Sequence, residues 1–118
     1  MRHKERIVFL DRAAFASGDD LPVPGFDHNW SEYPATEAED VVPRLFWATT
    51  AVTHRCPLDA GRLAQLHKLR RVVVTGPAEV DAEACRARGI TVRHLPADEA
   101  TGKALVGLLE TLVREGPD

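Results

Sequence analysis

Short apolar runs alternate along the chain with amphipathic segments. Four strands are predicted inside the sheet. The first is a nearly continuous apolar run and the third is rich in β-branched residues, as is typical of strands covered on both faces of a parallel sheet. These predicted strands span residues 6–11, 49–53, 71–75 and 90–95. Residues 17–29 are rich in Gly, Pro and Asp and are predicted to form a loop. Residues 30–33 are predicted to form a short edge strand, which Pro34 closes.

Three helices are predicted between these strands. The first opens at Thr36, where Glu39 stands three residues later and would complete a capping box. Pro43 then falls inside this helix, where it forces a kink or an early end. The second helix begins after Asp59, a favourable N-cap, and is expected to run to about Lys68.

A third predicted helix begins at Asp81 and ends at Gly89, a natural residue for the position after a helix. Asp98 can cap a last helix, in which the apolar side chains fall on one face: Leu105, Leu108, Leu109, Leu112 and Val113. Alternating strands and helices predict a doubly wound parallel sheet of about five strands in three layers, α/β/α. We expect one domain over residues 1–118.

Composition and charge narrow the possible partners. The chain has 118 residues and a net charge of -3, so nothing electrostatic favours nucleic acid. No segment reaches the roughly 20 apolar residues of a membrane helix, and no secretory leader is recognised. We therefore expect a cytoplasmic protein in which Cys56 and Cys85 remain thiols.

The carboxyl ends of the predicted strands carry the candidate chemistry. In open α/β sheets, ligands bind outside these ends, near the point where the strand order reverses. Helix N-termini near Asp59 and Asp81 open beside this rim and would favour an anion. The rim residues are Asp11, Arg12, His54, Arg55, Thr75, Gly76 and His94. The sequence therefore predicts a site for a small carbonyl or carboxylate ligand.

Catalytic and substrate-binding roles are predicted for the rim residues. His54 or His94 would be the acid–base group, with Asp11 or Asp98 orienting it. Arg55 would hold an anionic substrate, and the other predicted substrate-binding residues are Thr75, Gly76, Arg12 and Asp98. Structural alternatives stay open, because Asp11 and Arg12 can pair with each other and either histidine can cap a strand end.

Motifs for cofactors are not found in the sequence. No GxGxxG follows a strand, and no GxxxxGK[ST] segment is present to cradle nucleotide phosphates. No HExxH or paired Cys/His spacing supports a metal site. We therefore expect neither a cofactor nor a metal.

Five segments together resemble the N-terminal part of D-2-hydroxyacid dehydrogenases, nearest to the glycerate dehydrogenase and hydroxypyruvate reductase group. They occur in the family's order and with nearly its spacing. The segments are IVFLDR (7–12), FDHNW (26–30), VTHRCPLDAGRLAQL (52–66), TGPAEVD (75–81) and ACRARGITV (84–92).

This resemblance implies a flavodoxin-like substrate domain in which residues 74–77 offer backbone amides to a carboxylate. It also implies that Arg55 preserves the charge of a family lysine. The chain departs from the family at Ala78 and Glu79, which replace an Asn-Asn pair, at His94, which replaces Asn, and at Asp98, which replaces Tyr. The last helix matches the one that leads into the family's dinucleotide domain. The family's catalytic Arg, Glu and His lie beyond the matched segments, so none is carried over.

These observations leave several functions open. The first hypothesis is a cofactor-independent bacterial enzyme, a lyase or cyclase that uses acid–base chemistry beside a carbonyl of a keto-acid-like substrate. The second is a non-catalytic module that binds a carboxylate or a partner. A third is the substrate half of a split NAD-dependent dehydrogenase, and a fourth is a degenerate fragment. We also expect a homodimer formed through the apolar face of the C-terminal helix.

Overall fold

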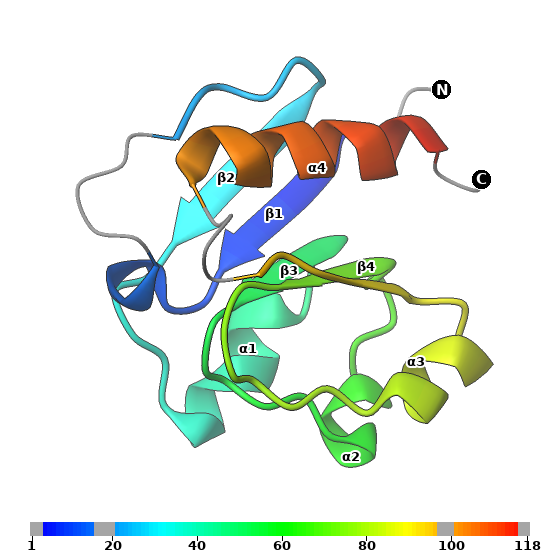
Figure 1. Cartoon of the computed structure of the whole chain (residues 1–118). Coiled ribbons are helices and arrows are strands. Elements are labelled where there is room, and N and C mark those ends of the chain that lie inside the picture. The colour runs from blue at the N-terminus through cyan, green and yellow to red at the C-terminus, as the bar shows by residue number, and fades with distance from the viewer. Residues whose placement is uncertain (1–3, 16–20, 97–100, 116–118) are drawn as a thin grey trace.

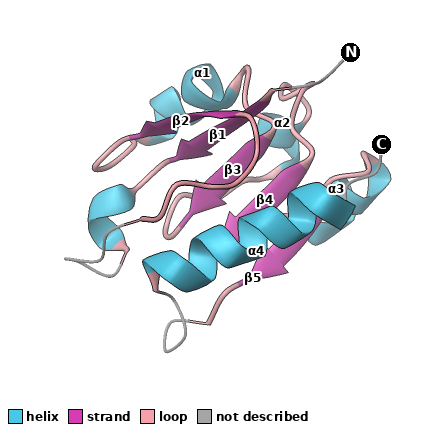
Figure 2. Ribbon diagram, turned by 90° about the horizontal axis from the view of Figure 1, so that it is seen from above, coloured by secondary structure: helices cyan, strands magenta, loops and turns pink. Residues whose placement is uncertain are grey.

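Five parallel strands form one sheet at the centre of the computed structural model, which describes residues 4–15, 21–96 and 101–115. The strands lie in the order β2-β1-β3-β4-β5 (Figures 1 and 2). This order reverses beside β1, as in flavodoxin-like folds, so the predicted fold class is confirmed. The bounds are β1 Glu5–Phe9, β2 His28–Glu32, β3 Thr50–Thr53, β4 Arg71–Val74 and β5 Thr91–His94.

Helices cover the two faces of the sheet unequally. The short helices α1 (Val41–Leu45), α2 (Ala60–Leu63) and α3 (Ala82–Ala87) lie on one face, and the long helix α4 (Gly102–Glu115) lies on the other (Figure 1). These layers bury the central strands β3 and β4 along their whole length. The edge strands β2 and β5 keep exposed positions because each has a neighbour on one side only.

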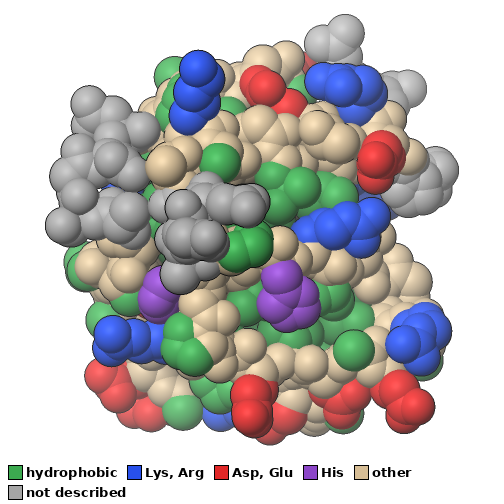
Figure 3. Space-filling model, in the orientation of Figure 1, with side chains coloured by type: hydrophobic (Ala, Val, Ile, Leu, Met, Phe, Trp, Pro, Cys, Tyr) green, Lys and Arg blue, Asp and Glu red, His purple; other side chains and the backbone are tan. Residues whose placement is uncertain are grey.

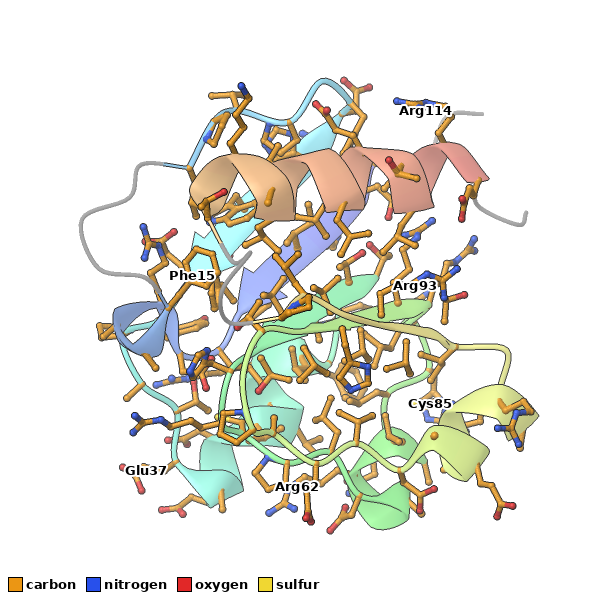
Figure 4. The ribbon with its side chains drawn as sticks, viewed as in Figure 1. Phe15, Glu37, Arg62, Cys85, Arg93 and Arg114 are labelled. Carbon is orange, nitrogen blue, oxygen red and sulfur yellow. The ribbon has the colours of Figure 1, made fainter. Side chains whose placement is uncertain are left out.

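Two apolar cores separate the layers. The core on the α1–α3 face includes Val8, Leu45, Leu63, Val72 and Cys85. The core under α4 includes Ile7, Phe9, Phe15, Val73, Leu105 and Leu109. Phe9 and Phe15 meet edge to face with their ring centroids 5.4 Å apart, and Phe15 closes this core beneath the first turns of α4 (Figure 4). Successive strand residues therefore point alternately into the two cores.

Several helix boundaries agree with their predicted caps. The Asp59 carboxylate accepts a hydrogen bond from the Arg62 amide at 2.9 Å, and Asp81 accepts one from the Ala84 amide at 3.0 Å. Gly89 follows α3 with φ of 74°, a left-handed conformation that side chains other than glycine rarely adopt. These local signals act over three or four residues, which is why the sequence reveals them.

Two helix predictions are wrong. Thr36 does not cap a helix, because its hydroxyl donates instead to the Leu10 carbonyl at 2.6 Å. A 3₁₀ turn at Ala38–Asp40 precedes α1, which is only five residues long. The helix after Asp59 ends at Leu63 rather than near Lys68, because tighter turns then direct Leu66 and Leu69 into the core.

The last helix packs against its own sheet. Leu105, Leu109 and Leu112 are buried in the core under α4, and the Thr101 hydroxyl accepts from the Ala104 amide at 3.1 Å at its start. Asp98, the predicted cap, lies outside the described residues. The sheet covers the apolar face of α4, so this face gives no separate reason for a second copy. The predicted homodimer stays a prediction.

A buried ion pair closes the amino edge of the sheet. Arg71 Nη1 lies 2.8 Å from Glu5 Oε1, and their side chains are only 5% and 12% exposed. The Thr49 hydroxyl donates to the same carboxylate oxygen at 2.7 Å. Arg71 starts β4 and Glu5 starts β1, so the pair reaches across β3 and links three strands.

Candidate functional site

The carboxyl edge of the sheet is organised around Asp11, directly after β1. Its side chain is buried, at 4% exposed, yet no cationic side chain compensates it in the described hydrogen bonds and ion pairs. Instead, Oδ1 accepts from the His54 amide at 2.8 Å and Oδ2 accepts from the Arg55 amide at 2.6 Å. Asp11 thus fixes the loop after β3 at the point where the strand order reverses.

His54 lies in this fixed loop with its ring half-buried. Its Nδ1 is 3.0 Å from the hydroxyl of Thr75, which is fully buried at the end of β4. Among the described residues the Thr75 hydroxyl has no other acceptor for its proton, so we assign Thr75 as the donor and Nδ1 as the acceptor. This tautomer carries its proton on Nε2, which has no partner in the described part of the chain.

Gly76 brings backbone against the His54 ring. A Cβ atom at residue 76 would lie 2.6 Å from His54 Cδ2, Cε1 and Nε2, a distance that no real Cβ tolerates. Only glycine lets this ring sit here without a shift. The Gly76 amide has no hydrogen-bond partner within residues 4–15, 21–96 and 101–115, so a free N–H and a free Nε2–H lie beside each other.

The loop after β4 uses its other amides to hold the loop after β3. The Thr75 amide donates to the Thr53 carbonyl at 3.0 Å, and the Ala78 amide donates to the His54 carbonyl at 3.0 Å. Pro77 has no amide proton. Of the amides of residues 75–78, only that of Gly76 remains to offer to a ligand.

A short parallel bridge joins the same two loops further along. The Leu58 amide donates to Glu79 O at 2.9 Å, and the Asp81 amide donates to Leu58 O at 3.0 Å. These bonds form an isolated bridge between Leu58 and Val80. The loops after β3 and β4 are therefore joined by hydrogen bonds into one connected surface beside His54 and Gly76.

Arg55 adds a positive charge at the same rim. Its backbone amide is held by Asp11, whereas its side chain is exposed. Among the described residues its guanidinium makes no ion pair or hydrogen bond. An exposed guanidinium can bind a carboxylate through two parallel N–H···O bonds. From the predicted set, the structure thus places His54 against Thr75 and Gly76, with Arg55 next to His54 along the chain and Asp11 behind them.

His94 lies in a different environment. It is exposed at the end of β5 and lines a hollow of about 530 Å³ together with Leu58, Ala78 and three acidic residues: Asp59, Glu79 and Asp81. Acidic side chains gather over the lower edge of the molecule in Figure 3, where α2 and α3 lie in Figure 1. Three carboxylates disfavour an anionic ligand there, so this hollow does not suit the predicted carboxylate.

Arg12 also lies apart from His54. The 3₁₀ turn Arg12–Ala14 directs it toward β2, where its Nε is 4.0 Å from Glu32 Oε2 and its guanidinium lies 5.6 Å from the centre of the Phe15 ring. It lines a hollow of about 370 Å³ with His28, Trp30 and Glu32. Of the predicted rim residues, Arg12 and His94 thus face other surfaces.

Sequence analysis missed the role of Thr53 and Cys56. The Thr53 hydroxyl accepts from the Cys56 amide at 3.0 Å and donates to the Cys56 carbonyl at 2.9 Å, which closes the turn that carries His54 and Arg55. Burial, with a further contribution from the Asp11 carboxylate, raises the pKa of the Cys56 thiol. Cys56 is therefore a packing residue and not a nucleophile. The Thr-x-x-Cys spacing was the available signal.

The described residues offer no place for a dinucleotide or a metal. The turn after β1 contains Leu10, Asp11 and Arg12 without glycine, and its carboxylate already occupies the nearest amides. The Gly76 turn is filled by the His54 ring. No group of three potential metal ligands lies together in the described part. The turns after β1 and β4 therefore do not match the glycine-rich turn that cradles dinucleotide phosphates.

These features define a flavodoxin-like α/β domain with a small polar site at its switch point. No protein-family model matches the chain. A protein of Haemophilus influenzae described as a 2-hydroxyacid dehydrogenase is 34% identical over 111 residues, which cover 91% of this chain and 35% of that protein. Glycerate dehydrogenase of Methylorubrum extorquens is 35% identical over 117 residues, which cover 93% and 36%.

The chain is therefore homologous to one part of the D-2-hydroxyacid dehydrogenases, as its motifs predicted, and it spans about a third of the length of these relatives. The hypothesis of a cofactor-independent lyase or cyclase is wrong, because the relatives that match nearly the whole chain are dehydrogenases. That hypothesis placed His54 and His94 along one shared edge as alternative acid–base groups. The structure instead places His54 and His94 in different surroundings.

No helix within the described ranges combines the length and the apolarity needed to cross a bilayer.

Proposed function

We propose that this chain is the substrate-binding part of an NAD-dependent 2-hydroxyacid dehydrogenase. The observation that carries the proposal is the match of two dehydrogenases to more than nine tenths of the chain. The ligand would be a short 2-hydroxy or 2-oxo acid of the glycerate or hydroxypyruvate type, in keeping with the name of the Methylorubrum relative.

The geometry at the switch point supports a carboxylate ligand. The Nε2–H of His54 and the amide of Gly76 are neighbouring donors without partners in the described chain, and Arg55 supplies a nearby positive charge. A carboxylate has two oxygens and can accept from all three groups. Thr75 holds the His54 ring, and Asp11 holds the backbone that carries His54 and Arg55.

The hydride donor belongs outside this set of residues. NAD would accept the hydride and NADH would donate it, but the turns after β1 and β4 do not fit the phosphates of this cofactor. We therefore assign to the residues described here only the binding and orientation of the acid. A dinucleotide-binding part, on the same longer protein or on a second polypeptide, would complete the enzyme.

Calorimetric titration with hydroxypyruvate and glyoxylate tests the carboxylate site. We expect saturable binding of either acid, and Arg55→Gln should weaken it about tenfold because a charge-assisted pair is lost. Arg70→Gln is the matched control, since Arg70 is exposed at the amino edge of the sheet, immediately before β4. Equal affinity for both variants, or no binding by the wild type, would exclude this site.

Reconstitution tests the dehydrogenase assignment separately. The chain is mixed with a dinucleotide-binding polypeptide taken from a dehydrogenase relative, and oxidation of NADH by hydroxypyruvate is followed by absorbance. Turnover that requires both polypeptides supports the proposal. Binding of the acid with no turnover in any such mixture would favour the non-catalytic carboxylate-binding module. We also propose a cytoplasmic location, in keeping with two buried thiols that form no disulfide.

A further inference from the structure

The backbone groups on the outer side of β2 have no partner among the residues that the structure describes. β2 pairs with β1 alone and lies at one edge of the sheet (Figure 2). The Glu5 amide donates to the Asp27 carbonyl, and the Tyr33 amide donates to the Phe9 carbonyl. Odd-numbered residues of this segment therefore face β1. Because backbone groups alternate along a strand, the amides and carbonyls of His28, Trp30 and Glu32 face outward.

Exposed apolar side chains gather on both sides of this edge. Within the described ranges, the large hydrophobic residues that are exposed are Val23 at 82%, Trp47 at 61% and Phe46 at 40%. Val23 shares one hollow with His28, Trp30 and Glu32. Trp47 shares another hollow, of about 350 Å³, with Asn29 and Ser31, and Phe46 stacks edge to face on Trp47. Exposed apolar groups grouped in this way mark an interaction surface.

The opposite edge of the sheet lacks these features. β5 presents the exposed side chains of Arg93 and His94, and charged side chains on an edge strand discourage pairing with another chain. β2 carries one charged residue, Glu32 at its end, but no lysine, arginine or proline, and its regular register with β1 over all five residues shows no bulge. β2 is therefore the edge suited to accept another strand.

We propose that β2 pairs antiparallel with β2 of a second copy of this chain, about a two-fold axis at Trp30. This arrangement places residue 28 opposite residue 32 and residue 30 opposite itself. In an antiparallel pair, such directly opposed residues exchange both of their backbone hydrogen bonds. The three residues whose groups face outward are the three that this register requires. The two five-stranded sheets become one continuous sheet, and symmetric pairing of this kind is the commonest form of dimer.

Side chains on the α4 face complement each other in this register. His28 of one copy lies opposite Glu32 of the other, twice in each dimer. The His28 Nδ1 is engaged with the Phe26 carbonyl at 2.7 Å, which leaves Nε2 available. Glu32 Oε1 accepts from Trp30 Nε1 at 2.8 Å and Oε2 lies 4.0 Å from Arg12 Nε, so the carboxylate is held beside the strand and would be shared by Arg12 and His28. A parallel or shifted arrangement would lose this pairing of a basic group with an acidic one.

The flanking aromatic residues explain why the strand that pairs with β2 would come from a second copy of this chain. On the α1 face, Asn29 and Ser31 of the second copy would extend the floor beneath Trp47. Trp47 and Phe46 of each copy would then be covered by β2 of the other copy. Each chain supplies both the exposed aromatic pair and the strand that covers it, so two copies satisfy each other and no third component is needed.

Light scattering after gel filtration tests the association. We expect a mass of twice 13.0 kDa for the wild type at concentrations up to ~100 μM. Trp47→Lys should raise the dissociation constant at least ~tenfold, because it adds a charge to each side of the interface. Gln65→Lys is the matched control, since Gln65 is exposed just after α2, and it should leave the mass unchanged. Circular dichroism verifies that both variants fold. A wild-type monomer at every concentration would overturn the proposal and leave a strand of another protein as the occupant.

Disulfide cross-linking tests the register. Asn29→Cys and Ser31→Cys are made as separate variants, and each is oxidised alone and in an equal mixture. Residues 29 and 31 of different copies lie directly opposite, with Cα atoms about 4.5 Å apart, so the mixture should give the linked dimer. Each variant alone should give several-fold less, because like residues are displaced diagonally. Equal yields from the mixture and from the single variants would overturn this register. The native Cys56 and Cys85 are buried and do not compete.

Discussion

Each end of the sheet contains a buried carboxylate, but the two are neutralised in different ways. At the amino edge, Glu5 is paired with the Arg71 guanidinium and receives the Thr49 hydroxyl. At the carboxyl edge, Asp11 receives two backbone amides, from His54 and Arg55. The first arrangement neutralises the carboxylate with a positive side chain, whereas the second neutralises it with backbone N–H groups only.

This difference supports placing the proposed anion site at the carboxyl edge. At the amino edge Glu5 and Arg71 neutralise each other, so this pair offers no charge to a ligand. At the carboxyl edge the Arg55 guanidinium and His54 Nε2 remain available, because Asp11 compensates its charge with the amides beneath them. The same type of residue thus stabilises the fold at one end and positions donors at the other.

The largest expected effect comes from breaking the ion pair. Glu5→Ala leaves the Arg71 charge buried and should lower the free energy of unfolding by about 3–5 kcal/mol. The double variant Glu5→Leu with Arg71→Met removes both charges and should recover most of the loss. Urea unfolding measures both values. If the double variant is less stable than Glu5→Ala, the pair itself stabilises the fold and our account of this edge fails.

Asp11→Ala should cost somewhat less, about 2–4 kcal/mol, because two amides lose a charged acceptor but no buried cation is left behind. Binding of hydroxypyruvate should weaken as well, since the loop that carries His54 and Arg55 is no longer held. Glu5→Ala serves as the comparison, measured below its unfolding temperature. Equal loss of affinity in both variants would remove the distinction between the two edges.

Gly76→Ala should affect binding more than stability. The added Cβ would meet the His54 ring at 2.6 Å, and the ring is a side chain that can rotate away. We expect a loss of stability near ~1 kcal/mol and a roughly tenfold weaker affinity for the acid. Gly61→Ala is the control, since its Cβ would meet its nearest atom, Asp59 Oδ1, at 3.8 Å. An unchanged affinity in Gly76→Ala would show that the His54 ring does not touch the ligand.

The smallest effect concerns the thiols. Burial first, and then Asp11, raises the pKa of Cys56, so the folded state keeps this proton to higher pH than the unfolded chain does. The raised pKa stabilises the folded state fully at pH values below the pKa of the unfolded thiol, about 8.5. This contribution to stability declines as the pH rises above that value. Urea unfolding of the wild type and Cys56→Ala between neutral and alkaline pH should therefore show a difference that narrows as pH rises. A constant difference would contradict the burial argument.

The sequence predicted those strands and helix caps that depend on residues close together along the chain. The strands follow from β-branched runs such as residues 71–74, and the caps at Asp59 and Asp81 need partners only three residues away. Such signals are local, so they survive without knowledge of the tertiary structure. The length of α2 was overestimated because the sequence shows only local helix propensity. The burial of Leu66 and Leu69, which overrides it, depends on the tertiary structure.

The site was only partly predictable because its contacts join distant segments. The rule that strand ends share an edge brought His54, Arg55, Thr75 and Gly76 together correctly. It did not reveal that Asp11 would bind amides 43 and 44 residues away, or that a 3₁₀ turn would direct Arg12 toward β2. The pairing of Glu5 with Arg71 spans 66 residues and has no local signature either.

The bridge between Leu58 and Val80 also has a consequence for hydrogen–deuterium exchange. The Leu58 and Asp81 amides are held by opposite loops, so neither proton can exchange unless both loops separate. The two amides should therefore share one opening rate. An acid bound beside Gly76 should slow the exchange of both amides equally, although it touches neither of them.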